Sequence, residues 1–329
     1  MRCMSAVALA TPALALLSGC ASASSPNTGL LSSTTMAPPA WVRIRNDASD
    51  ARAVYVSSFY QGTILGFSPA NDRNRPPRCS LSSSYPNDIA SDPQGNLIVP
   101  EGGPLTVVVY AGSPTCGPEI GSFSDPYGYP TDAASRNAAT GIIYIGNFEA
   151  RNQLYGDVAV CSLSGGCTTR LANVAIGGAL IGVAVDRRGG VYASGQTAQS
   201  GEGASLVYWP NGKGTGREMT AFKNASPGGL DIDATGNILA LDPVAPALWV
   251  YSGCPSTCAA HGPFPLKGTA EFGKVNEQNS IFEAADYPLG QVDVYAYHGT
   301  AGIAYKYSYN SGMNVAGEFK GIARSPAAH

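Results

Sequence analysis

Acidic side chains recur beside short apolar segments of this 329-residue chain. Asp88 and Asp132 each open such a segment, and a second group of polar residues closes the apolar segments that follow. This second group is Glu101, Asn147, Asp242 and Asp286. Carboxylate and amide oxygens in a cluster are the ligands that Ca²⁺ prefers. Close carboxylates also raise the pKa of one member, as general-base chemistry needs.

The segments that carry these residues form a repeat. Residues 86–100, 181–195, 228–242 and, in degenerate form, 130–147 each contain an apolar strand, a polar turn and a second apolar strand. A weaker copy spans residues 273–286. The turn glycines Gly95, Gly141, Gly189 and Gly236 recur every 46 to 48 residues. This period lies just above the 40–45 residues of a four-stranded propeller blade.

Two further strands are expected in each repeat. The predicted third strands are residues 105–110, 157–161, 205–209, 247–251 and 291–297, and the predicted fourth strands are residues 119–123, 168–171, 218–222, 264–266 and 302–307. Four strands per period predict a blade. An open solenoid and a seven-bladed ring are alternatives, but six blades account for nearly all of the chain from residue 50.

The two ends of the repeat region complement each other. Residues 54–57, 63–67 and 78–81 resemble a blade without its first strand, and residues 320–325 resemble a first strand with nothing after it. We therefore predict an all-β, six-bladed β-propeller over residues 50–329, closed by one blade that both ends of the chain share. Closure removes sheet edges that would otherwise aggregate.

The hairpin pattern resembles the NHL-type repeat and the wider group of six-bladed propellers that includes gluconolactonase-like enzymes. In gluconolactonase-like propellers, carboxylates and Asn hold a metal at one mouth of the central channel. Because adjacent strands of a blade are antiparallel, the starts of first strands and the ends of second strands are expected at one mouth of the channel, with Asp88 and Asp132 on neighbouring blades. Asp88, Asp132 and Glu101 are candidate Ca²⁺ ligands, and Asn147, Asp242 and Asp286 are expected around them. Glycines at the matching strand starts, such as Gly182 and Gly273, would leave room there. The alternative is that these residues simply cap turns.

Aromatic residues are expected on loops at the same mouth. Tyr127, Tyr129, Phe148 and Tyr287 could line a sugar- or peptide-binding site, or pack over the blades. The histidines His261, His298 and His329 lie in no catalytic motif and are expected in exposed loops. The chain contains no nucleophile-elbow, zinc-protease or phosphate-loop sequence.

The composition supports a turn-rich β protein. The 40 Gly and 24 Pro argue against a helical bundle, because both residues destabilise helix interiors. The net charge of −3 comes with no basic stripe, so nucleic acid is not an expected partner.

The first twenty residues read as an export signal. Arg2 precedes an apolar stretch over residues 4–17, which is too short for an ordinary membrane-spanning helix. Leu17-Ser18-Gly19-Cys20 resembles the lipobox of bacterial lipoproteins. The resemblance implies a signal peptide at residues 1–19, lipidation of Cys20, and anchoring at the bacterial envelope through a Ser/Thr/Pro-rich tether that ends near residue 49. Ala21 in place of Asp suggests the outer membrane. A plain secretory signal is the alternative.

Six cysteines remain after Cys3 and Cys20. Cys161–Cys167 and Cys254–Cys258 are expected to form disulfides between third and fourth strands in an oxidising compartment. Cys79 and Cys116 pair by elimination. A zinc site is disfavoured because neither cysteine spacing has a suitably placed histidine.

Two functional hypotheses follow. The first is an envelope lipoprotein whose monomeric propeller binds a protein, peptide or glycan without catalysis. The alternative is a metal-dependent lactonase of the gluconolactonase-like type, with the acidic mouth holding Ca²⁺ or another divalent cation. An envelope assembly scaffold is a third possibility. No cofactor is assured.

Overall fold

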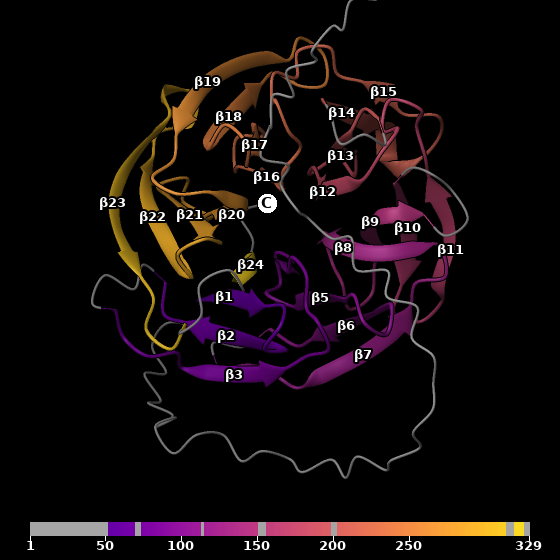
Figure 1. Cartoon of the computed structure of the whole chain (residues 1–329). Helices are drawn as coiled ribbons and strands as arrows, with labels where there is room; N and C mark the ends of the chain where they lie inside the picture. Colours follow the sequence, from indigo (N-terminus) through magenta and orange to yellow (C-terminus); the bar gives the residue numbers. More distant parts are fainter. Residues whose placement is uncertain are drawn as a thin grey trace, which may run out of the picture. The chain divides into compact units, whose positions relative to one another are not determined.

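The computed structural model of the chain describes residues 52–69, 74–112, 115–150, 156–198, 203–313 and 319–325. Within these residues, six antiparallel four-stranded sheets surround a central channel (Figure 1). The fold is an all-β, six-bladed β-propeller, which confirms the predicted class. The described helices are two single turns, Pro210–Gly212 and Gly299–Ala301. Neither is long enough to cross a membrane.

Each blade is named here by its four strands, from the channel outward. Blade 1 contains β24 (Phe319–Ser325), β1 (Ala53–Ser58), β2 (Thr63–Phe67) and β3 (Cys79–Ser82). Blade 2 contains β4 (Ala90–Ser91), β5 (Leu97–Glu101), β6 (Thr106–Tyr110) and β7 (Glu119–Ser124). Blade 3 contains β8 (Gly128–Ser135), β9 (Ile143–Ala150), β10 (Asp157–Ser162) and β11 (Gly166–Leu171).

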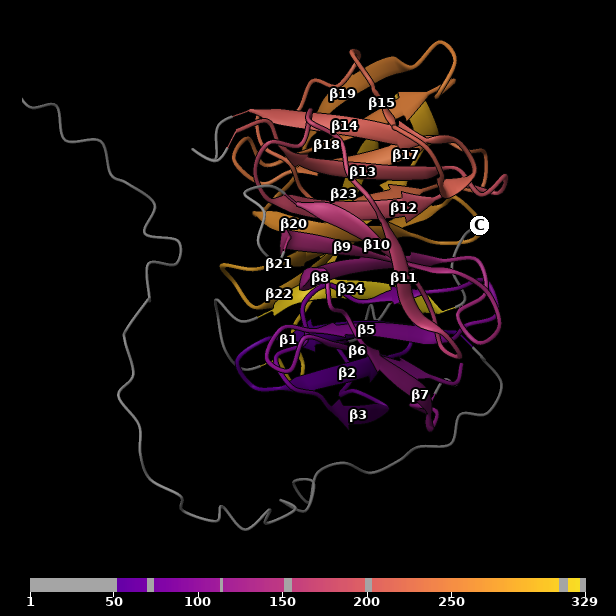
Figure 2. The same ribbon diagram turned by 90° about the vertical axis from the view of Figure 1, so that its right-hand side faces the viewer.

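The remaining three blades repeat the same order. Blade 4 contains β12 (Leu180–Val185), β13 (Val191–Gln196), β14 (Ala204–Trp209) and β15 (Arg217–Glu218). Blade 5 contains β16 (Leu230–Ile232), β17 (Ile238–Asp242), β18 (Ala247–Ser252) and β19 (Ala259–Pro265). Blade 6 contains β20 (Ala270–Val275), β21 (Ile281–Asp286), β22 (Gln291–Tyr297) and β23 (Ile303–Tyr309). Figure 2 shows the blades from the side.

The ring closes as the sequence predicts. The C-terminal strand β24 is the innermost strand of blade 1 and pairs antiparallel with β1, with Tyr55 opposite Ala323 and Val56 opposite Ile322. The apolar side chains of this blade contribute to two core clusters, one against blade 6 and one against blade 2. The two ends of the propeller are therefore held by both a β-ladder and buried apolar surface.

The predicted hairpin turns form. The amide of Gly95 donates to the Asp92 carbonyl at 2.9 Å, and Gly189 and Gly236 bond Asp186 and Asp233 in the same way. These three glycines adopt φ of +88°, +82° and +89°, which side chains disfavour. In the weaker fifth copy of the hairpin, the Asn279 amide donates to the Asn276 carbonyl, and Asn279 has φ of +53°.

Two predicted outer strands differ from the structure. The predicted strand 218–222 is reduced to the two residues of β15, because the chain turns where the Phe222 amide donates to the Met219 carbonyl. Met219 and Phe222 instead pack against the core of blades 4 and 5. The outer strand of blade 5 begins five residues earlier than predicted, at Ala259.

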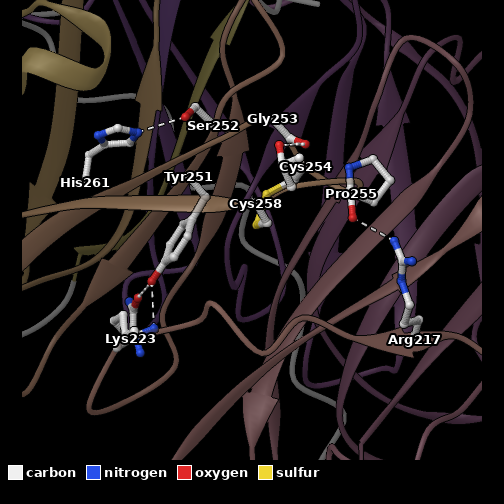
Figure 3. The surroundings of a disulfide bond; sticks show 11 residues. Arg217, Lys223, Tyr251, Ser252, Gly253, Cys254, Pro255, Cys258 and His261 are labelled. Atoms are coloured by element: carbon white, nitrogen blue, oxygen red, sulfur yellow. Dashed lines mark hydrogen bonds between the residues drawn. A yellow bond between two sulfur atoms is a disulfide. The ribbon is translucent and has the colours of Figure 1, made fainter.

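This earlier start corrects the expectation for one histidine. His261 lies within β19 and not in a loop, and its Nε2 is 2.8 Å from the Ser252 hydroxyl (Figure 3). His298 lies exposed in a turn, as expected, and His329 is outside the described residues.

The three predicted disulfides are present. Cys161–Cys167 and Cys254–Cys258 each close a short loop between the third and fourth strands of one blade, and Figure 3 shows the latter. Cys79–Cys116 spans 37 residues and joins the outer part of blade 1 to blade 2, with the two Cα atoms 5.8 Å apart. Cys3 and Cys20 lie outside the described residues.

The interblade disulfide should contribute more stability than the local ones. Loop-closure entropy gives about 4 kcal/mol for the 37-residue separation of Cys79–Cys116 and about 2 kcal/mol for the 6-residue separation of Cys161–Cys167. We expect the paired substitution of Cys79 and Cys116 by Ala to lower the urea midpoint more than the same change at Cys161 and Cys167. Equal losses in urea unfolding would contradict this order.

Candidate functional site

Asp88 and Asp132 do come together at one end of the channel, called the upper end here because every first strand begins there. Both side chains are fully buried. Asp88 Oδ1 accepts a hydrogen bond from the Ile322 amide of blade 1 at 3.0 Å. Asp132 Oδ2 accepts one from the Val183 amide of blade 4 at 2.6 Å. Each carboxylate thus ties its own blade to the next.

Lys274 supplies the positive charge for this buried group. Its Nζ lies 3.6 Å from Asp88 Oδ2 and donates to the Leu230 carbonyl at 3.1 Å. Burial is the largest influence on the pKa of Lys274 and lowers it, but the combined charges of Asp88, Asp132 and Asp231 raise it overall. The ammonium therefore occupies the place that a metal cation would take beside these carboxylates.

Burial dominates the titration of the carboxyl pair. It raises the pKa of Asp88 well above its ordinary value; Lys274 opposes this, and the neighbouring Asp132 raises the pKa further. Burial also raises the pKa of Asp132, against the favourable effect of Lys274 and two backbone amides. Burial therefore favours the neutral form of each carboxyl group, whereas Lys274 and the backbone amides favour the ionised form.

The second group of predicted ligands does not join this pair. Glu101 accepts hydrogen bonds from the Ser83 hydroxyl at 2.7 Å and the Ser84 amide at 2.8 Å. Asp242 accepts from the amides of Ala225, Val244 and Ala245. Both carboxylates thus hold loops at the rim of the upper end.

Asn147 and Asp286 occupy the equivalent position in blades 3 and 6. Asn147 donates to Asp157 Oδ1 at 2.9 Å, and Asp286 Oδ2 lies 3.3 Å from Gln291 Nε2. The expected grouping of Asp88, Asp132 and Glu101 around one cation is not formed, because strand ends lie at the rim and strand starts lie in the channel. In the described part of the chain, no three His, Cys, Asp or Glu side chains are arranged to hold a metal.

The channel beneath the pair is narrow. A cavity of about 30 Å³ is lined by Ala90, Ala134 and Ala184 on one half and by Asp231, Lys274 and Arg324 on the other. A cavity of this size holds roughly two water molecules.

The charged half of the channel was not anticipated from the sequence. Lys274 lies two residues before the turn residue Asn276, and Asp231 lies two before Asp233. In the alignment of the repeats, the turn of the fifth copy was placed one residue too late, so the equivalence of Lys274 and Asp231 was not visible. Arg324 forms a buried ion pair with Glu283 of blade 6. A charged residue two positions before the turn in the copies of blades 5 and 6 was the available signal.

A tyrosine cluster lies at the upper end. Phe59 and Tyr60 follow β1, and the Phe59 ring lies 5.0 Å from Tyr60 and 5.4 Å from Tyr85. Tyr129 and Tyr287, both predicted mouth residues, lie close enough to Tyr60 that its charge raises the pKa of each, although burial is the larger cause. Blades 1, 2, 3 and 6 therefore contribute aromatic rings to one site.

The other two aromatic residues predicted at the mouth, Tyr127 and Phe148, are not part of this tyrosine cluster. Tyr127 is half-buried and packs against the core between blades 2 and 3. Phe148 is half-buried near the end of β9. Tyr127 matches the alternative expectation that loop aromatics pack over the blades.

Exposed apolar side chains concentrate at the same end. Eight large hydrophobic residues are exposed in the described part of the chain. Five of them lie in connections at the upper end: Tyr60, Tyr85, Val174, Val244 and Leu289. Val244 is 69% exposed and Tyr60 58%. We call these five residues the upper face. Exposed apolar residues on one face make that face a candidate interaction surface.

Substitutions of the buried residues Lys274 and Asp88 should change the stability of the protein in different ways. Lys274→Met leaves three acidic side chains without their cation and should cost about 3–5 kcal/mol of unfolding free energy. Lys306→Met, on the exposed face of β23, is the control and should change little. Differential scanning fluorimetry at pH 7 measures both. Equal melting temperatures for the two variants would contradict the role assigned to Lys274.

Asp88→Asn should instead make the stability of the protein depend less on pH. The folded pKa of Asp88 is raised, so its contribution to stability is full below its ordinary pKa of about 4 and is lost as pH rises through the raised value. The melting temperature of Asp88→Asn relative to the parent protein should therefore increase between pH 5 and pH 8. Asp233→Asn is the control: hydrogen bonds from Thr235, Asn237 and Tyr297 lower the pKa of Asp233 despite burial, so this change should destabilise at neutral pH.

Solved structures share this fold at low sequence identity. No family model and no curated protein matches the sequence. One similar structure is titled a nidogen/laminin complex, with 12% identity and TM-score 0.61, covering 83% of this chain and 98% of that chain. Another is the periplasmic gluconolactonase PpgL of Pseudomonas aeruginosa, with 14% identity and TM-score 0.57, covering 84% of this chain and 99% of the other. A protein of unknown function from Bacteroides caccae matches at 8% identity and TM-score 0.57, covering 83% and 98%. These likenesses agree with the propeller architecture.

Proposed function

We propose that this protein is a non-enzymatic binding module that docks a protein or peptide partner on its upper face. The observation that carries the proposal is that five of the eight exposed large hydrophobic side chains among the described residues lie in connections at this end. Aliphatic tips such as Val244 and Leu289 favour apolar side chains of a protein over the hydroxyl-rich surface of a glycan. Tyrosine is also enriched among residues that dominate protein interfaces.

The tyrosine cluster is the expected centre of the interface. Tyr60 and Tyr85 are exposed, whereas Tyr129 and Tyr287 are half-buried. The Asn87 side chain beside Tyr129 donates to the Pro130 carbonyl at 2.7 Å and so holds the loop beneath the cluster. Rings on a fixed platform bind with little loss of conformational freedom. An apolar or aromatic side chain of the partner would insert between them.

The geometry supports binding over a lactonase. The carboxylates proposed for metal binding and base catalysis accept backbone hydrogen bonds, contact Lys274, or hold rim loops. A general base must come within about 3 Å of the proton it removes, and Asp88 and Asp132 are fully buried. The fold likeness to a gluconolactonase therefore extends to the scaffold, and a hydrolytic role rests on no observed site.

The envelope location is part of the same proposal. The lipobox-like residues 17–20 support lipidation at Cys20, and three disulfides suit an exported protein. A lipid-anchored propeller on a tether would present its upper face to a partner at the bacterial envelope.

Site-specific photo-crosslinking tests the docking face. A photoreactive phenylalanine derivative placed at position 60, 85, 244 or 289 in the full chain should yield the same discrete protein adduct in cells of the native host. Positions 120, 142 and 305 are exposed hydrophobic sites away from the upper face and are the controls. The partner identified in this way should bind the purified Tyr60→Ala, Tyr85→Ala double variant at least tenfold more weakly, since two aromatic contacts are removed.

Several outcomes would contradict the proposal. Adducts that form only from the control positions would place the interface on the outer strands or on the β8–β9 connection. Retention of purified protein by glycans in a Tyr60-dependent manner, without any protein adduct, would assign a carbohydrate ligand. Lactone hydrolysis that is lost in Asp88→Asn but not in Tyr60→Ala would favour the enzyme hypothesis.

The anchor has a separate test. Cys20→Ser in the full chain should move the protein from the membrane fraction to the soluble exported fraction, because the acylated residue is lost. Cys3→Ser, within the same signal segment, should leave the protein in the membrane fraction. Membrane retention of Cys20→Ser would show that Cys20 is not the anchor.

A further inference from the structure

Three oxygen-bearing side chains meet at the upper edge of blade 3, away from the channel pair. Asp125 lies in the connection from β7 to β8, Asn147 lies near the end of β9, and Asp157 begins β10. Asn147 and Asp157 are opposite each other in the β9–β10 ladder. All three side chains are at least 98% buried.

Two oxygens of this group have no hydrogen-bond partner among the described residues. They are Oδ2 of Asp125 and Oδ1 of Asn147. The other oxygen of Asp125 accepts the Tyr127 amide at 2.8 Å, so the loop fixes the carboxylate in place. Buried polar atoms of native proteins are almost always satisfied by protein, water or ions. The unpartnered atoms therefore point to a ligand that is neither backbone nor side chain.

The local charge favours a cation. The carboxyl groups of Asp125 and Asp157 are both buried beside the Asn147 side chain, which donates to Asp157 Oδ1 at 2.9 Å. The Arg170 guanidinium reaches one oxygen of Asp157 at 3.4 Å and is the cationic group paired with this site. Arg170 therefore contacts Asp157, and Asp125 forms no ion pair among the described residues.

We propose that Asp125, Asn147 and Asp157 form a calcium-binding site. Two carboxylates and an amide carbonyl are hard oxygen donors, which Ca²⁺ accepts in flexible geometry together with water. The Asn147 amide donates its Nδ2 to Asp157 in the structure. A half-turn of this amide would exchange Nδ2 for Oδ1 and direct a carbonyl oxygen at the carboxylates, an arrangement that a bound cation stabilises.

Blade 6 provides a natural comparison. There Gln291 Nε2 lies between Asp286 at 3.3 Å and Asp293 at 2.9 Å, and the Ser308 hydroxyl donates to Asp293 at 2.5 Å. Lys267 donates to that hydroxyl at 3.1 Å, so protein donors extend the network to the surface. Asp286 Oδ1 also has no hydrogen-bond partner among the described residues, but the Lys267 ammonium and the Ser308 hydroxyl already belong to this network. The blade 3 group has no such hydroxyl bridge among its described contacts, so calcium should bind there in preference to blade 6.

Thermal unfolding of the full chain with and without Ca²⁺ tests the site. With two carboxylates, we expect a dissociation constant of about 10⁻⁴–10⁻³ M, as in extracellular calcium modules. About 10 mM Ca²⁺ should then raise the melting temperature by roughly 3–8 °C relative to a chelator control. The same concentration of Mg²⁺ should give a smaller shift, because Mg²⁺ gives up its water reluctantly.

Matched variants decide where the calcium binds. Asp125→Asn should abolish most of the shift, whereas Asp293→Asn in blade 6 should retain it. Asn147→Asp adds a third carboxylate and should lower the dissociation constant measured by titration calorimetry, which keeps the test available if Asp125→Asn folds poorly. No shift in the parent protein, or an equal shift in Asp125→Asn, would overturn the proposal. A stoichiometry above one ion per chain that persists in Asp125→Asn would also do so.

Discussion

The first strand of each blade has one edge that faces the channel and has no neighbouring strand. Its amide groups are buried, and each unpaired buried amide carries a free-energy penalty of roughly 1–3 kcal/mol. In this protein, carboxylates from neighbouring blades accept these amide hydrogens. Asp88 accepts from the Ile322 amide, Asp132 from the Val183 amide, and Asp231 from the Val275 amide. Three buried carboxylates then require a cation, and Lys274 provides it. The centre of the ring is thus a polar, interblade joint and not an open site.

This joint determines where binding can occur. The channel is reduced to a small cavity, and the acidic groups that resemble a metal mouth are engaged in holding blades and loops. The connections at the upper end do not line this cavity, and they carry the exposed Tyr60, Tyr85 and Val244. A propeller with a rigid centre and variable connections is a scaffold on which binding surfaces arise without altering the core. The proposed calcium site of blade 3 would stabilise one of these connections.

Much of the architecture was predictable because its signals are local. The turns at Asp92, Asp186 and Asp233 follow from a residue pattern whose chemistry lies within four residues. The closing blade and the disulfides followed from counting strands and cysteines once the period was known. The failures concern contacts between blades. Glu101 and Asp242 were expected beside Asp88, but strand starts lie in the channel and strand ends at the rim. Lys274 was missed because Asn279 replaces the usual turn glycine and shifted the alignment by one residue.

The sequence by itself determined the class of fold, the number of blades, the closure of the ring and the cysteine pairs, because periodicity and turn chemistry act over short distances. The tertiary structure alone decided what the polar residues do. Whether a carboxylate is a metal ligand, a buried partner of Lys274 or a turn cap depends on groups from blades about 40 to 230 residues away. Burial sets the cost of its charge, and no spacing along one chain reveals which amide or ammonium will compensate it.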